Sequence, residues 1–121
     1  MIAILIREPG WEELFDRLSA SSAVGVGAPT LAEASLVLTT RLGVEGKRLL
    51  ALFVMESEIA VVPFGDAHWK AAADAHRRYG KGHHRAGLNF GDCLSYAVAK
   101  LADQPLLCTG SNFSKTDLPI A

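Results

Sequence analysis

The sequence predicts an α/β domain in which a mostly parallel sheet carries helices on both faces. Short apolar runs alternate with longer helical patterns, and this alternation is typical of parallel sheets. The 121 residues suffice for one domain, and half of them are hydrophobic while 21% are charged, which is typical of a globular chain. No run approaches the roughly 20 apolar residues that a transmembrane helix needs, so no membrane association is expected.

The first elements are predicted from apolar periodicity and from the residues that interrupt it. Residues 1–8 resemble the end of a helix, because the following Pro9 and Gly10 stop helices firmly. Apolar residues at helical spacing predict a helix over 11–20. The glycine-containing apolar run 24–28 then predicts a short strand, with close backbone approach at its glycines.

A helix that is apolar nearly all round is predicted over 30–42, with Pro29 at or near its first turn. Glu33 interrupts this apolar surface, and its helical neighbours at i+3 and i+4 are Leu36 and Val37. An ionised carboxylate in apolar surroundings is very costly unless it is paired or bound to a metal. Glu33 is therefore a candidate metal ligand, unless it reaches a nearby cation or escapes at the rim.

The middle of the chain predicts a helix, a strand and another helix in succession. The helix is expected over 45–57 from its spaced leucines, and the strand over 59–64, where Pro63 limits ladder pairing near the end. The alanine-rich run 66–79 is expected to be helical, with Asp66 as its N-cap.

The nine residues from Arg77 to Arg85 are strongly basic, with four cations, two histidines, one tyrosine and two glycines. They could simply form a solvated helix end and loop. They could also form a flexible loop that binds nucleic-acid phosphates in a salt-sensitive way while Tyr79 stacks on a base. The candidate contact residues are Arg77, Arg78, Lys81, His84 and Arg85.

Asn89 and Asp92 mark the start of the next predicted helix, whose apolar pattern continues through Leu94, Val98 and Leu101. Asn89 is a good N-cap, and an acid three residues later is typical of a capping box. Asp92 is therefore either a capping partner on an ordinary helix or a metal ligand held at a helix N-terminus, and the local sequence leaves both interpretations open.

The last predicted elements are a buried strand over 105–109 and a short strand over 117–120. In parallel sheets, ligands bind at the carboxyl ends of strands. Glu33 and Asp117 each follow a predicted strand, and Asp92 begins a helix, so the three acids could meet at one edge. Clustered acids repel one another unless a divalent ion joins them, and carboxylates suit magnesium or manganese.

Charge and cysteine usage exclude several classes of protein. The net charge is −1, so any affinity for nucleic acid must come from a local patch. Cys93 and Cys108 lie in apolar surroundings without zinc-site spacing, and we expect small buried residues in a reducing compartment rather than a disulfide. The apolar run 1–6 lacks the basic lead and cleavage site of a signal peptide, so a cytoplasmic protein is expected.

Three stretches of the sequence resemble the PIN-domain toxins of the VapC type. They are residues 79–100, which contain a Leu-Asn-Phe-Gly-Asp-Cys run, the ending 105–117, and Glu33 in its Leu-Ala-Glu-Ala-Ser setting. The resemblance covers the chain from Ile4 onward, and its motif over 80–93 is long and specific. It implies a single PIN-like domain over 1–121, folded as a three-layer sandwich.

The resemblance also implies an activity and partners. PIN-domain toxins of this type are endoribonucleases that hydrolyse RNA phosphodiester bonds with Mg²⁺ or Mn²⁺. They are silenced by a VapB-type antitoxin and commonly form homodimers. Carried over residue by residue, Glu33 and Asp92 fall on acidic positions of the metal cluster, and Asp117 falls on a further acidic position near the C-terminus.

Two departures from the family pattern leave other functions open. The family opens with a strand ending in Asp that this chain lacks, so either a misplaced start codon within a longer gene or a degraded gene is expected. Where the family usually has Asp, this chain has Asn112, which offers an oxygen but no charge. One alternative is therefore a catalytically impaired PIN remnant that binds antitoxin or RNA without cleavage. Another is an unrelated α/β binding module whose carboxylates are scattered.

Overall fold

The computed structural model describes residues 11–20, 24–104 and 113–120, which fall into two compact units on either side of the boundary between Val62 and Pro63. Each unit has its own hydrophobic core. The helix end predicted over 1–8 and the strand predicted over 105–109 lie outside the described residues. None of the described helices is long and apolar enough to cross a membrane.

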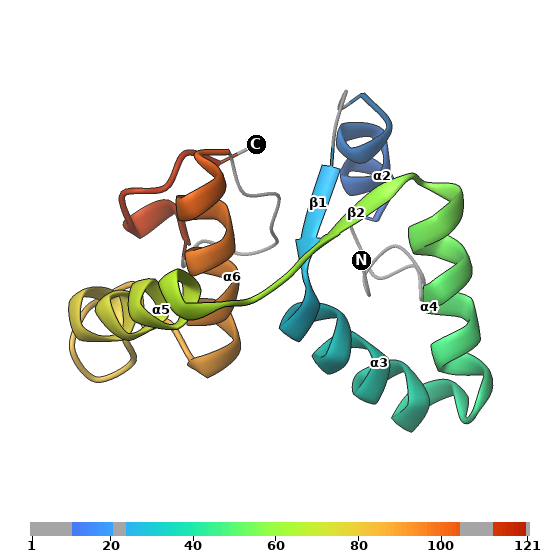
Figure 1. Ribbon diagram of the computed structural model, residues 1–121, viewed down its shortest axis with the longest axis horizontal. Coiled ribbons are helices and arrows are strands. Elements are labelled where there is room, and N and C mark those ends of the chain that lie inside the picture. The colour runs from blue at the N-terminus through green and yellow to red at the C-terminus, as the bar shows by residue number, and fades with distance from the viewer. Residues whose placement is uncertain (1–10, 21–23, 105–112, 121) are drawn as a thin grey trace. The chain divides into compact units, whose positions relative to one another are not determined.

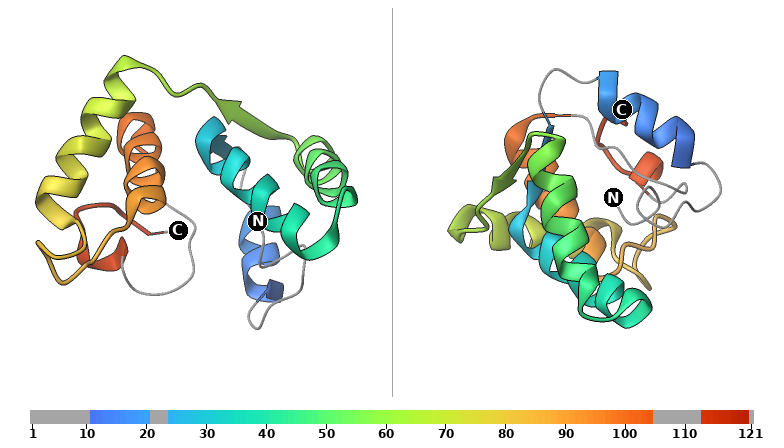
Figure 2. Two further views of the ribbon diagram at one scale, coloured as in Figure 1. Left: turned by 90° about the horizontal axis from the view of Figure 1, so that it is seen from below. Right: turned by 90° about the vertical axis from the view of Figure 1, so that its right-hand side faces the viewer.

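The first unit combines a parallel strand pair with a helical hairpin (Figures 1 and 2). The two strands pair in parallel, with Val24 opposite Ile59, and the connection between them contains both helices of the hairpin. This pairing confirms the predicted fold class. The elements are α2 (Trp11–Ala20), β1 (Val24–Gly27), α3 (Ala28–Leu42), α4 (Glu45–Glu56) and β2 (Ile59–Val62).

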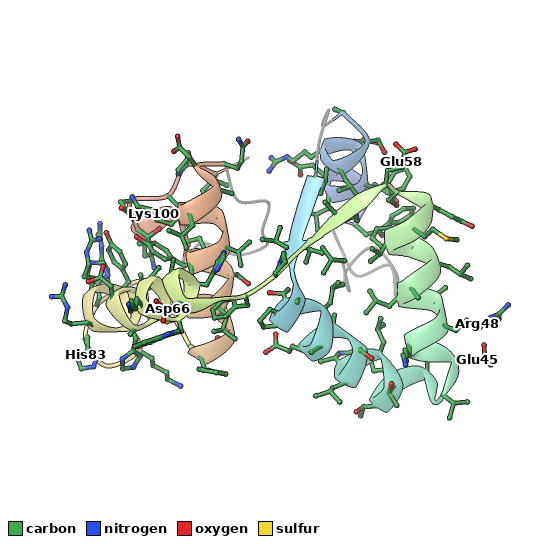
Figure 3. All side chains as sticks on the ribbon, in the orientation of Figure 1. Glu45, Arg48, Glu58, Asp66, His83 and Lys100 are labelled. Carbon is green, nitrogen blue, oxygen red and sulfur yellow. The ribbon has the colours of Figure 1, made fainter. Side chains whose placement is uncertain are left out.

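A close contact between α3 and α4 sets the hairpin. Leu38 of α3 is fully buried and packs with Ala34 and with Leu50 of α4. Gly46 of α4 lies directly on the α3 backbone, because a Cβ built there would sit 2.6 Å from the Leu38 carbonyl. The outer side of α4 carries the exposed ion pair between Glu45 and Arg48 (Figure 3).

The second unit is built on two packed helices, α5 and α6, which lie side by side in Figures 1 and 2. Tyr96 and Leu88 are almost fully buried in its core, beside small alanines of both helices. A single parallel bridge between Gly80 and Leu88 closes the loop that joins the helices. The elements are α5 (Asp66–Tyr79), α6 (Phe90–Ala102) and the 3₁₀ helix η1 (Phe113–Lys115).

The N-cap predicted for α5 is wrong by one residue. Gly65 occupies that position, and its backbone N–H donates to Nδ1 of His68 at 3.1 Å. The imidazole therefore satisfies a free amide at the start of the helix. Asp66 instead accepts hydrogen bonds from Trp69 at 2.8 Å and from Lys70 at 2.9 Å.

The strand predicted over 117–120 is not formed, since Asp117 and Leu118 are bends and Ile120 forms only an isolated bridge. The side chain of Thr116 explains the difference. Its hydroxyl donates to the carbonyl of Phe113 at 2.6 Å and accepts from the N–H of Leu118 at 3.2 Å. Such local bonds offer the backbone an alternative to sheet pairing.

Candidate functional site

Asp92 is held in a fixed orientation at the N-terminus of α6. Its Oδ2 accepts a hydrogen bond from the backbone N–H of Asn89 at 3.0 Å, and its own N–H donates to Asn89 Oδ1 at 2.8 Å. The predicted capping box is therefore formed. Oδ1 of Asp92 takes no hydrogen bond from the residues that the structure describes, which leaves one oxygen of an oriented carboxylate for a ligand.

Asp117 lies against the same helix through two hydrogen bonds. Tyr96 Oη donates to Asp117 Oδ1 at 2.6 Å. Lys100, which is labelled in Figure 3, donates from Nζ to Asp117 Oδ2 at 2.7 Å. Asp92, Tyr96 and Lys100 follow one another at four-residue spacing and so share a side of α6. Both carboxylate oxygens of Asp117 are thus already engaged, unlike those of Asp92.

The electrostatics of this contact favour an ionised Asp117 and a neutral Tyr96. Partial burial acts to raise the pKa of Asp117, but hydrogen bonds from Lys100 and Tyr96 outweigh it and hold the pKa below its usual range. Burial raises the pKa of the Tyr96 phenol, and the hydrogen bond to Asp117 raises it further. Arg78 of α5 adds positive charge, with Nη1 4.0 Å from Asp117 Oδ2.

Glu33 lies on an exposed part of α3 in the first unit. The expectation that its helix face is buried is wrong, because α3 buries only Ala34 and Leu38 while Leu36 is 71% exposed. An exposed carboxylate remains solvated and carries no desolvation cost that a metal must offset. Its part as a metal ligand stays a prediction from the sequence.

A three-ligand metal cluster is not found within residues 11–20, 24–104 and 113–120, where no three His, Cys, Asp or Glu side chains gather suitably. Asn112 lies outside the described residues. The carboxylate of Asp92 is oriented, partly exposed and offers a hard oxygen, which suits one position of a magnesium site. The predicted meeting of Glu33, Asp92 and Asp117 stays a prediction.

The basic segment divides into paired and unpaired cations. Arg77 and Arg78 both contact Asp74, with shortest N–O distances of 2.6 Å and 3.6 Å. Lys81 and Arg85 are exposed and form no ion pair with any described residue. These two side chains therefore carry most of the charge that the segment can offer to a phosphate.

Two aromatic contacts shape the same loop. The ring of His84 meets Tyr79 edge-on at 5.2 Å between centroids, and its Nδ1 accepts the N–H of Ala86 at 3.0 Å. His83 packs in the same manner on His76 of α5, at 5.1 Å. Both histidines are thus tied to the body of the unit.

Tyr96 and Lys100 were not predicted from the sequence, although their spacing from Asp92 was a usable signal.

Cys93 is a buried free thiol, as expected for a small core residue. Burial raises the pKa of the Cys93 thiol, and the nearby charge of Asp92 adds to the effect, so both favour the neutral thiol over the reactive thiolate. Cys108 lies outside the described residues.

Comparisons with known proteins place the chain in a family. The PIN domain model matches residues 1–118, and the chain therefore belongs to the PIN-domain family. Within that family it belongs with the VapC proteins. It is 41% identical to the "Ribonuclease VapC" of Mycolicibacterium smegmatis over 118 residues, which cover 98% of this chain and 92% of the relative.

Two relatives from Mycobacterium tuberculosis agree with this assignment. "Ribonuclease VapC36" is 44% identical over 101 residues, which cover 84% of this chain and 73% of the relative. "Ribonuclease VapC30" is 38% identical over 118 residues, which cover 98% and 90%. The resemblance that the sequence motifs indicated is thereby confirmed.

Proposed function

We propose that this protein is a metal-dependent endoribonuclease toxin that hydrolyses RNA phosphodiester bonds and is silenced by a VapB-type antitoxin. The main support is the alignment over nearly the whole chain with relatives that are VapC ribonucleases. A cytoplasmic homodimer that uses Mg²⁺ or Mn²⁺ completes the proposal. The oriented carboxylate of Asp92 gives it a chemical basis.

Asp92 and Glu33 are the proposed metal ligands. A divalent cation bound there would supply an activated water and stabilise the leaving oxygen of the phosphodiester. The capping box orients Asp92 for that task, while Lys81 and Arg85 attract and position the RNA backbone. The contacts of Asp117 with Tyr96 and Lys100 support a different part for this acid, which is to anchor the C-terminal segment on α6.

The test is cleavage of single-stranded RNA by the purified full chain, with Mg²⁺ and then with EDTA. Asp92→Asn keeps an oxygen for the Asn89 N–H but loses the charge. Loss of a metal ligand removes several kcal/mol of transition-state stabilisation, so cleavage is expected to fall by about 100-fold or more.

Asp103→Asn is the matched control, because Asp103 is an exposed acid at the other end of α6. Its backbone is left-handed, with φ +53°, which asparagine tolerates well. This variant should cleave like the wild type. Equal cleavage by Asp92→Asn would remove Asp92 from the mechanism, and no cleavage by any form alongside retained antitoxin binding would favour the non-catalytic PIN remnant.

A further inference from the structure

An apolar pocket of about 770 Å³ opens in the second unit beside the N-terminus of α6. Its volume lies within the range of small-molecule pockets. Buried side chains line its interior, among them Ala72, Leu88 and Cys93. Two large aromatic side chains that also line it are exposed, Trp69 by 55% and Phe90 by 78%.

Trp69 is held in place rather than free to rotate. Its Nε1 donates to Asp66 Oδ1 at 2.8 Å, and Lys70 Nζ lies 5.7 Å from the ring centroid. Lys70 Nζ also pairs at 2.9 Å with Asp66, which is labelled in Figure 3, so the negative charge beside the ring is balanced. A fixed, exposed indole without net negative charge at its edge is a suitable platform for a second aromatic ring.

The polar residues of the pocket suit a nucleotide. Lys81 belongs to the basic segment and is unpaired among the described residues, so it offers a cation for a phosphate. Asn89 also lines the pocket, and its Oδ1 is committed to the N–H of Asp92. The amide nitrogen of Asn89 makes no hydrogen bond to the described residues and offers donors to a base edge.

We propose that this pocket takes one unpaired base of the RNA substrate, stacked on Trp69 and Phe90 while Lys81 holds an adjoining phosphate. The inference rests on the proposed ribonuclease function and adds the residues that select an unpaired nucleotide. Because Asn89 belongs both to the pocket and to the capping box of Asp92, the stacked base lies next to the proposed metal ligand. Single-stranded nucleic acids bind through this combination of aromatic stacking and cationic backbone contacts.

The chain contains two tryptophans, Trp11 and Trp69, so Trp11→Phe leaves Trp69 as the one fluorescent indole. The full-length variant is titrated in EDTA, which prevents metal-dependent cleavage, with a short single-stranded RNA. A strand of equal length without bases is the second probe. The RNA should quench Trp69 to saturation, and the abasic strand should not, because stacking requires the base.

Substitutions at Phe90 test the second platform in the same background. Phe90→Ala should weaken RNA binding roughly 5- to 150-fold, the effect of losing one stacking partner, and Phe90→Tyr should restore it. Phe15→Ala is the matched control, since Phe15 is an exposed phenylalanine on α2, and it should bind like the parent. Asp92→Asn should lose cleavage while keeping the quenching of Trp69.

Each contrary result has a distinct meaning. The base pocket would be overturned if anisotropy shows that RNA binds while Trp69 stays unquenched, and if Phe90→Ala binds RNA as tightly as Phe15→Ala. Metal-dependent cleavage in the same experiment would still support the proposed function. Unchanged Trp69 fluorescence would instead favour a pocket that binds a protein segment. Absence of both RNA binding and cleavage would overturn the two proposals together.

Discussion

Replacing Asp117 by alanine should destabilise the second unit mainly through Tyr96. The Tyr96 residue is 2% exposed, and leaving a buried hydroxyl without its acceptor costs about 1–3 kcal/mol. The pair with Lys100 adds little, since the two side chains are 48% and 30% exposed and such pairs contribute about 0–1 kcal/mol. The expected loss for Asp117→Ala is therefore about 2 kcal/mol, against roughly 0.5 kcal/mol for Lys100→Ala.

A double-mutant cycle isolates the Tyr96–Asp117 contact. Replacing both partners is less costly than orphaning one, so Tyr96→Phe combined with Asp117→Ala should fall short of additivity by about 1–2 kcal/mol. Urea unfolding followed by Trp69 fluorescence, in the Trp11→Phe background, reports on the second unit. Strict additivity, or equal losses for Asp117→Ala and Lys100→Ala, would refute the reasoning.

The same variants separate an anchoring acid from a metal ligand. A cation that binds the native state raises the melting temperature by mass action. Mg²⁺ should therefore still raise the melting temperature of Asp117→Ala and should fail to raise that of Asp92→Asn. Loss of the Mg²⁺ effect in both variants would make Asp117 a ligand, as the sequence alone predicted.

Two further predictions concern pH and packing. The pKa of Tyr96 is raised in the folded state. Its contribution to stability is therefore intact below the usual tyrosine pKa of about 10 and is lost as the pH rises above it. Urea midpoints measured from pH 8 to pH 11 should fall less steeply in Tyr96→Phe than in the wild type or in the control Tyr79→Phe. Gly46→Ala should lower the free energy of unfolding by about 1–3 kcal/mol, because the added Cβ forces α4 away from the backbone of α3. Urea unfolding followed by circular dichroism measures this loss. Gly65→Ala is the control and should cost far less, since nothing lies within 4 Å of its added Cβ.

The helices and strands of the described chain were largely predictable from the spacing of apolar residues and from the residues that interrupt helices and strands. The helices predicted over 11–20 and 66–79 match α2 and α5 residue for residue, because apolar spacing is strong there and breakers flank it. The N-cap of α5 was missed because two adjacent residues, Gly65 and Asp66, both suit that position. The side chain of His68 decides between them, and its rotamer is not encoded in a local pattern.

The candidate site was predictable only where it is local. The two residues of the capping box, Asn89 and Asp92, are three positions apart, so their spacing alone predicted it. The contact between Tyr96 and Asp117 joins residues 21 apart and depends on how the C-terminal segment folds back. The burial of the α3 face that carries Glu33 was predicted wrongly. When a helix is apolar nearly all round, its sequence does not indicate which face packs against the rest of the unit.

The two interpretations of Asp92 that the sequence left open are compatible in the folded chain. A carboxylate has two oxygens, and the capping box uses Oδ2 while Oδ1 takes no hydrogen bond from a described residue. The bond to Oδ2 fixes the side chain, and a ligand that is already fixed loses less rotamer entropy when it binds. Capping therefore orients Asp92 and leaves its Oδ1 for a cation. At Asp117, the Lys100 ammonium already lies on Oδ2, and its positive charge opposes a second cation there. This difference between the two acids, set by hydrogen bonds within one unit, supports the proposal that a metal ion binds at the N-terminus of α6.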